Sequence, residues 1–113
     1  MEITISRFEN FDGFSESIGV IMRISEEIEL VLGYYGEYET DAETIDYYYP
    51  YIDVVIRDNV EDSYRVGIGI PRSLLMDGRT DLRVEEEKKM VVRQLVSDYP
   101  ELSDYFQRIL EAW

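Results

Sequence analysis

Apolar and polar residues alternate at the start of the chain, as they do in a β-strand. Over residues 2–8, Ile3 and Ile5 fall on one side of this pattern and are expected to face a core. The sequence Asn-Phe-Asp-Gly at residues 10–13 then predicts a turn, because these residue types suit tight backbone bends. The chain is therefore expected to open with a strand followed by a turn.

The next apolar segment, residues 15–34, fits two patterns. Its aliphatic residues recur at helical spacing, but those between residues 17 and 24 also alternate as in a strand. Ser25 followed by two glutamates is typical of a helix start, since a hydroxyl caps the first amides and carboxylates suit the positive end of the helix dipole. We predict a strand over 17–24 and a helix over 26–34, with a single long helix from Ser15 as the alternative.

The middle of the chain is predicted to hold a loop and then a hairpin. Residues 37–50 are expected to form a long loop or irregular edge segment, closed by Pro50. Residues 51–57 and 63–70 alternate on both sides of a polar turn, so they form the clearest predicted hairpin. Pro71 is expected to end the second strand, because proline cannot donate to the sheet ladder.

Two helices are predicted at the end of the chain. One spans about residues 81–97 and is capped by Thr80 or Asp81. Pro100 opens the other, since proline is tolerated in a first helical turn. Its apolar stripe comprises Leu102, Tyr105, Phe106, Ile109 and Leu110. The pattern predicts a single acidic α+β domain over residues 1–113, with an antiparallel sheet of three to four strands and two or three helices packed on one face.

Charge is distributed unevenly along this chain of 113 residues and net charge −14. Residues 1–56 carry two bases and thirteen acids, a net of −11, whereas residues 57–113 carry nine bases and twelve acids, a net of −3. No Lys or Arg occurs between Arg23 and Arg57, where nine carboxylates and seven of the ten tyrosines lie. Such a surface cannot neutralise itself locally. Its natural complement is a basic surface of the kind that binds nucleic acid.

The composition excludes several kinds of chemistry. The chain contains no Cys and no His, so disulfide, thiolate and imidazole chemistry are absent. Paired carboxylates can hydrolyse glycosides or assist phosphoryl transfer, but no spacing here selects a pair. We therefore expect no enzyme activity, no cofactor and no metal site. Because no apolar run could span a membrane and the first twenty residues lack a basic n-region, a cytoplasmic location is expected.

Carboxylates occur at every second position from Glu37 to Glu43. In an extended chain they would share one face and lie about 6.6–6.8 Å apart, a step comparable with that between phosphates along a nucleic-acid strand. A row of this kind could imitate a short segment of nucleic-acid backbone.

Three consecutive tyrosines form the second candidate feature. They cannot all face a core in an extended chain, because alternate side chains point to opposite faces. We predict that Tyr47, Tyr49 and Tyr51 pack on the core and that Tyr48 points outward, where its ring could stack on an Arg of a basic partner. The predicted partner-binding residues are Glu26, Glu27, Glu29, Glu37, Glu39, Asp41, Glu43, Asp46, Tyr38 and Tyr48.

The overall character resembles the small acidic nucleic-acid mimics of phages and mobile elements, which block restriction, repair or CRISPR machinery by occupying a nucleic-acid channel. This resemblance implies an inhibitor in the host-cell cytoplasm that binds a basic nuclease, CRISPR effector or restriction enzyme, and binds neither nucleic acid nor membranes itself. One alternative is an immunity protein or antitoxin that neutralises a basic nuclease toxin. Another is a salt-adapted housekeeping domain, since Arg outnumbers Lys by nine to two. Homodimerisation is left open.

Overall fold

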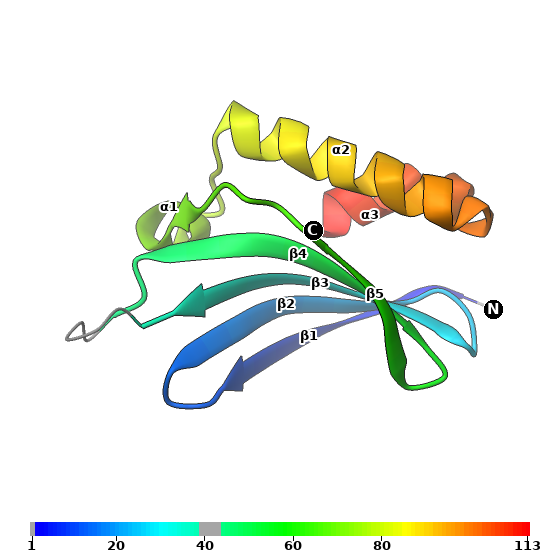
Figure 1. The fold of residues 1–113 in the computed structure, drawn as a ribbon, viewed down its shortest axis with the longest axis horizontal. Helices are drawn as coiled ribbons and strands as arrows, with labels where there is room; N and C mark the ends of the chain where they lie inside the picture. The colour runs from blue at the N-terminus through cyan, green and yellow to red at the C-terminus, as the bar shows by residue number, and fades with distance from the viewer. Residues whose placement is uncertain (1, 39–43) are drawn as a thin grey trace.

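The computed structural model describes residues 2–38 and 44–113, which form an antiparallel sheet with helices on one face (Figure 1). The sheet order follows the chain: β1 (Thr4–Phe11), β2 (Ser15–Arg23), β3 (Ile28–Glu37), β4 (Tyr47–Ile56) and β5 (Asn59–Arg65), with the short β6 (Ile70–Pro71) pairing with β4. The predicted α+β class and antiparallel sheet are confirmed. The predicted count of three to four strands is wrong, because the sheet formed by these described residues has six strands.

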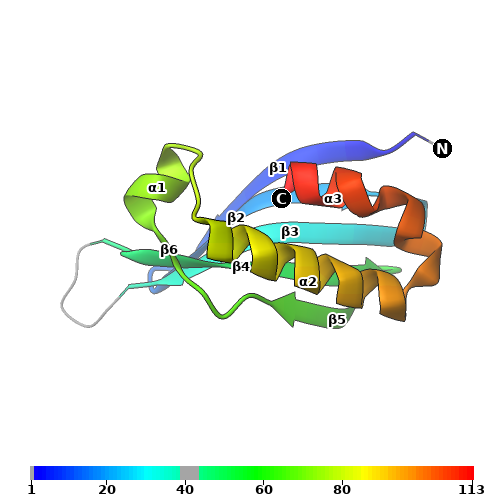
Figure 2. The same cartoon turned by 90° about the horizontal axis from the view of Figure 1, so that it is seen from above.

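The helices follow the strands along the chain. They are α1 (Arg72–Met76), α2 (Leu82–Asp98), the 3₁₀ turn η1 (Pro100–Tyr105) and α3 (Phe106–Ala112). Figures 1 and 2 show α2 and α3 lying over one face of the sheet, with α1 near one end of it. Asp81 caps α2, since its carboxylate accepts a hydrogen bond of 2.9 Å from the backbone amide of Val84. Both helices predicted at the end of the chain are therefore present.

The predicted helix over 26–34 is wrong, and so is the long helix from Ser15. The Ser25 hydroxyl does accept hydrogen bonds from the amides of Glu27 (3.3 Å) and Ile28 (3.1 Å), as a helix cap would. Here, however, these bonds close the turn between β2 and β3. The same local chemistry therefore closes a turn. Of the two elements predicted here, only the strand over 17–24 is confirmed, since it corresponds to β2.

Residues on both faces of β3 explain why it is a strand. Leu30 and Leu32 are fully buried beneath the helices. Gly33 belongs to the opposite face, where the ring of Tyr51 lies against it. A strand sends successive residues to opposite faces, so one segment can serve both surfaces.

The hairpin of β4 and β5 is confirmed, but its boundaries differ from those predicted. β4 begins at Tyr47, so the segment predicted as a loop over 37–50 is partly strand. The turn consists of Arg57 and Asp58, whose positive φ angles of 50° and 67° suit the twist of a tight hairpin. β5 ends at Arg65 instead of continuing towards residue 70, and β6 forms separately beside the start of β4.

The hydrophobic core lies between the sheet and the two longer helices. Its buried members include Met22, Leu30, Leu32, Ile52 and Val54 from the strands and Val92, Leu95, Leu102 and Ile109 from the helical half. The predicted stripe of the last helix faces this core, with Tyr105, Phe106 and Leu110 partly buried against it. Ile5 was predicted to face inward, but it is largely exposed because β1 is an edge strand.

Candidate partner-binding surface

Exposed aromatic rings and carboxylates gather at one end of the sheet. Because neighbouring strands are antiparallel, the end of β1, the start of β2, the end of β3 and the start of β4 meet there (Figure 1). We define the loop-end surface as Phe11, Asp12, Phe14, Glu37, Tyr38, Asp46 and Tyr47. This set contains three carboxylates and no Lys or Arg.

Phe14 is the most exposed ring of the loop-end surface, at 80%. The Asp12 carboxylate accepts hydrogen bonds from the amides of Phe14 (2.9 Å) and Ser15 (2.8 Å), and from the Ser15 hydroxyl (3.0 Å). These bonds also hold the pKa of Asp12 below its ordinary value, because they favour the charged carboxylate. The turn therefore presents Phe14 from a fixed backbone. Sequence reasoning missed this residue, although an Asp-Gly turn between two phenylalanines was a usable signal.

The end of β3 is tied to the same turn. The amide of Tyr38 donates to the carbonyl of Phe14 at 2.9 Å, and the rings of Phe11 and Tyr38 meet edge to face with centroids 5.9 Å apart. The Tyr35 hydroxyl donates to the Glu37 carboxylate at 2.7 Å, which raises the pKa of Tyr35. These contacts hold aromatic and acidic groups of the loop-end surface in place.

The predicted orientation of the tyrosine cluster is inverted. Tyr48 is fully buried, whereas Tyr47 and Tyr49 are 50% and 44% exposed. The Tyr48 hydroxyl accepts a hydrogen bond from the guanidinium of Arg72 (2.6 Å) and donates to the carboxylate of Glu16 (3.2 Å). Burial raises the pKa of Tyr48 above its ordinary value. Tyr48 is therefore a core residue and is removed from the predicted binding set.

Packing on the two faces explains this inversion. Alternation correctly places Tyr48 on one face of the sheet and Tyr47, Tyr49 and Tyr51 on the other. It cannot say which of the two faces the helices cover. Tyr48 pairs with Ile70 of β6, immediately before α1, and its side chain is enclosed on that side. Tyr51 is buried on the other face, where its ring lies against the sheet and its hydroxyl bonds to a serine of β2.

The predicted acidic residues do not form one surface. Glu37, Tyr38 and Asp46 lie at the loop end, whereas Glu26, Glu27 and Glu29 lie around the turn at the opposite end of the sheet. The step along β3 from residue 29 to residue 37 corresponds to about 27 Å of extended chain. Three further predicted residues, Glu39, Asp41 and Glu43, lie outside the described residues.

Arg23 and Arg57 border the base-free stretch in the sequence. In the structure both contact the turn between β2 and β3, at the end of the sheet opposite the loop-end surface. Arg57 forms a 3.0 Å ion pair with Glu27. Arg23 donates to the carbonyls of Ser25 (3.3 Å) and Glu26 (3.4 Å). At this end the structure pairs one carboxylate of the stretch, that of Glu27, because Arg57 approaches it from a distant position in the sequence.

The described residues contain neither a cluster of metal-binding side chains nor a membrane-spanning helix. Within residues 2–38 and 44–113, no group of three or more His, Cys, Asp or Glu is arranged to hold a metal ion. No helix of these residues is long and apolar enough to cross a membrane.

Comparison with protein-family models, curated proteins and solved structures finds no match to this chain, so its function is inferred from its own residues.

Proposed function

We propose that this chain is a non-catalytic inhibitor that binds the basic nucleic-acid-binding groove of a partner protein. The observation that carries the proposal is the loop-end surface, where the exposed rings of Phe11, Phe14 and Tyr47 lie among three carboxylates. A nucleic-acid-binding groove presents the complementary chemistry, since Arg and Lys line it to contact phosphates. The chain would occupy the groove in place of nucleic acid.

Charge supplies the first part of the mechanism. A net charge of −14 attracts a basic partner from a distance and speeds the encounter. The carboxylates of Asp12, Glu37 and Asp46 then orient the loop-end surface towards the basic residues of the groove, which would otherwise contact the phosphates of a nucleic acid. Because mobile ions screen such attraction over about 8–10 Å at physiological ionic strength, added salt should weaken binding steeply.

Exposed rings supply the second part, because charge alone gives speed and orientation more than long residence. Phe14 and Tyr47 can enter the groove and stack on arginine guanidinium groups. The Asp12 hydrogen bonds already fix the turn that carries Phe14, so little ordering entropy is lost on binding.

Affinity capture with matched baits tests this proposal. The wild-type chain is expected to capture a basic nucleic-acid-handling protein from cells that carry the gene, and the double variant Phe14→Ser/Tyr47→Ser is expected to lose it. Val60→Ser/Met90→Ser is the control, because it removes two exposed apolar side chains outside the loop-end surface. Retention of the partner by the loop-end variant, or a partner without a basic groove, would contradict the proposal. Capture of a nuclease toxin would identify the inhibitor as an immunity protein.

A further inference from the structure

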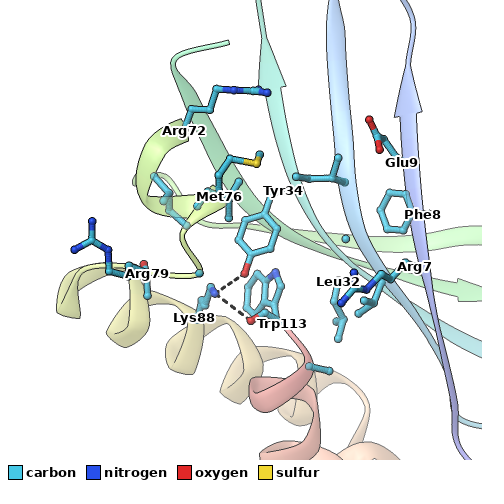
Figure 3. Close-up of a pocket in the computed structure, with 18 of the residues that line it drawn as sticks. Arg7, Phe8, Glu9, Leu32, Tyr34, Arg72, Met76, Arg79, Lys88 and Trp113 are labelled. Carbon is cyan, nitrogen blue, oxygen red and sulfur yellow. Dashed lines mark hydrogen bonds between the residues drawn. The ribbon is translucent and has the colours of Figure 1, made fainter. Parts of the chain in front are cut away.

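A pocket opens on the helix-covered side of the sheet, and Leu32 and Trp113 of the hydrophobic core belong to its lining. It lies among β1, β2 and β3, α1, the beginning of α2 and the end of α3 (Figure 3). Its volume of about 910 Å³ is suited to a small organic molecule. Apolar side chains from three sides line it, among them Ile18, Val20, Leu32, Leu75, Met76 and Trp113.

Positive charge gathers around this pocket, in contrast to the rest of the chain. The charged lining residues are Arg7, Arg72, Arg79 and Lys88 together with Glu9, Glu16 and Glu85. Four bases and three acids leave the lining a net charge of +1, whereas the chain as a whole carries −14. More than a third of the chain's eleven bases therefore line one pocket.

Lys88 is the central charge of the pocket and is only 3% exposed. Its Nζ donates to the Tyr34 hydroxyl (2.8 Å) and the Trp113 carbonyl (3.3 Å), as the dashed lines in Figure 3 show. The Tyr34 hydroxyl is a neutral acceptor, the Trp113 oxygen belongs to the last residue of the printed sequence, and the Glu85 carboxylate lies 3.8 Å from Nζ. Burial lowers the pKa of Lys88, because the ammonium is poorly solvated there. An ammonium carries three protons, and the two hydrogen bonds that Lys88 donates among the described residues leave one proton for an anion in the pocket.

Two hydroxyl groups of the pocket lining, those of Tyr34 and Thr80, can bind a ligand. The Thr80 Oγ1 is buried without a hydrogen-bond partner among residues 2–38 and 44–113, and Thr80 lines the pocket. Such an unpaired buried hydroxyl is costly unless something binds it. Tyr34 accepts its bond from Lys88, so its own proton remains available, and burial raises its pKa so that the proton is kept. Both hydroxyls can donate to an anion.

We propose that this pocket binds a small amphipathic anion, with a carboxylate or phosphate head on an apolar body. The head lies against Lys88 and the Tyr34 hydroxyl, and the Thr80 hydroxyl and the Arg7 guanidinium belong to the lining of the same pocket. The apolar body lies on the side chains around Leu32 and Trp113. This site is separate from the loop-end surface, so either can exist without the other.

Titration of the full chain with decanoate tests the proposal, with decyltrimethylammonium as a cation of the same chain length. Trp113 is the only tryptophan and lines the pocket, so its fluorescence reports occupancy directly. We expect saturable binding of one decanoate per chain at submillimolar concentration and no saturable change with the cation. A chain of charge −14 would favour the cation if binding were non-specific, so equal binding of both, or preference for the cation, would overturn the proposal.

Matched variants locate the site. Lys88→Met should weaken decanoate binding by about tenfold or more, the loss expected for one charge-assisted hydrogen bond. Lys89→Met removes the same charge from the next residue, which lies outside the pocket lining, and should bind as wild type does. Arg7→Gln changes an exposed residue on an edge strand and provides a second test if Lys88→Met unfolds. Unchanged decanoate affinity in Arg7→Gln and in a folded Lys88→Met, or equal losses in Lys88→Met and Lys89→Met, would refute the assignment.

Discussion

The ring of Tyr51 occupies the space that a side chain at position 33 would need. A Cβ added to Gly33 would lie 2.6 Å from Cε1 of Tyr51, closer than such atoms approach in folded proteins. The absence of a side chain at this point of β3 lets a large aromatic residue be buried on the face of the sheet opposite α2 and α3. Gly33 is therefore a packing requirement of the sheet.

Gly33→Ala should destabilise the fold by about 1–3 kcal/mol, the usual cost of overpacking a closely packed site. Gly67→Ala is the matched control, since a Cβ there meets no atom within 4 Å and Gly67 has no positive φ. Urea denaturation of both variants compares the free energies of unfolding. Equal stability of the two variants would show that Tyr51 can move aside without cost.

Truncation of the two neighbouring tyrosines Tyr48 and Tyr49 of β4 should lower the free energy of unfolding by very different amounts. Tyr48→Ala should cost about 3–5 kcal/mol, because it leaves a cavity in a closely packed region. It would also remove the hydroxyl that joins Arg72 to Glu16. Tyr49→Ala should change stability by less than about 1 kcal/mol, since its ring is substantially exposed. A larger loss from Tyr49→Ala, measured by urea denaturation, would reverse the assignment of faces.

Stability should fall at alkaline pH because several tyrosines hold their protons more tightly in the folded chain. The affected residues are Tyr34, Tyr48, Tyr51, Tyr64, Tyr99 and Tyr35, and the pKa of Tyr35 is raised by its hydrogen bond to Glu37. Burial raises the pKa of the first four, and the hydrogen bond from Tyr99 to Asp62 raises the pKa of Tyr99 to about 12. Their contribution is complete below the ordinary pKa of 10.0 and is lost as pH rises through the higher folded values.

Lys88 acts in the opposite direction, since burial lowers its pKa and the neutral amine is favoured in the folded chain. One lysine opposes six tyrosines, so the net change should be a loss of stability above pH 10.0. Tyrosinate absorbance and the free energy of unfolding, measured on the same samples, check this prediction. A free energy of unfolding that stays constant while the tyrosines ionise would contradict it.

Single charge reversals should distinguish the two acidic ends of the sheet. Glu37→Lys at the loop end should weaken partner binding by about tenfold, which corresponds to about 1.4 kcal/mol. Glu26→Lys makes the same change of net charge at the opposite end, and it should have a smaller effect. Dissociation constants measured at two salt concentrations provide the comparison. Equal losses from both variants would mean that net charge acts without a specific surface.

The elements predicted correctly are those in which local pattern and tertiary environment agree. Alternation identified β2 and the β4–β5 hairpin, and the Asp81 cap and apolar stripe identified α2 and the last helical segment. The helix predicted over 26–34 failed because Ser25 binds amides in a turn just as it would at a helix start. The packing of Tyr51 against Gly33, which favours a strand there, depends on a residue in another strand.

The candidate surface was only partly predictable for the same reason. Alternation separated Tyr48 from Tyr47 and Tyr49, but the covered face is decided by α1 and β6, which come later in the chain. The base-free stretch included Glu37 and Asp46, which lie at the loop end of the sheet. It also included Glu27, because sequence separation hid the approach of Arg57. Folding thus pairs Glu27 at one end of the stretch and adds Phe14 at the other.

Displacement of DNA from the captured partner is the most direct test of the proposed inhibition. Labelled DNA is bound to the purified partner, the wild-type chain is added, and the released fraction is measured by fluorescence anisotropy. We predict complete release by the wild-type chain and little release by Phe14→Ser/Tyr47→Ser, with Val60→Ser/Met90→Ser acting as wild type does. Simultaneous binding of DNA and the wild-type chain to the partner would contradict the claim that the loop-end surface occupies the nucleic-acid groove.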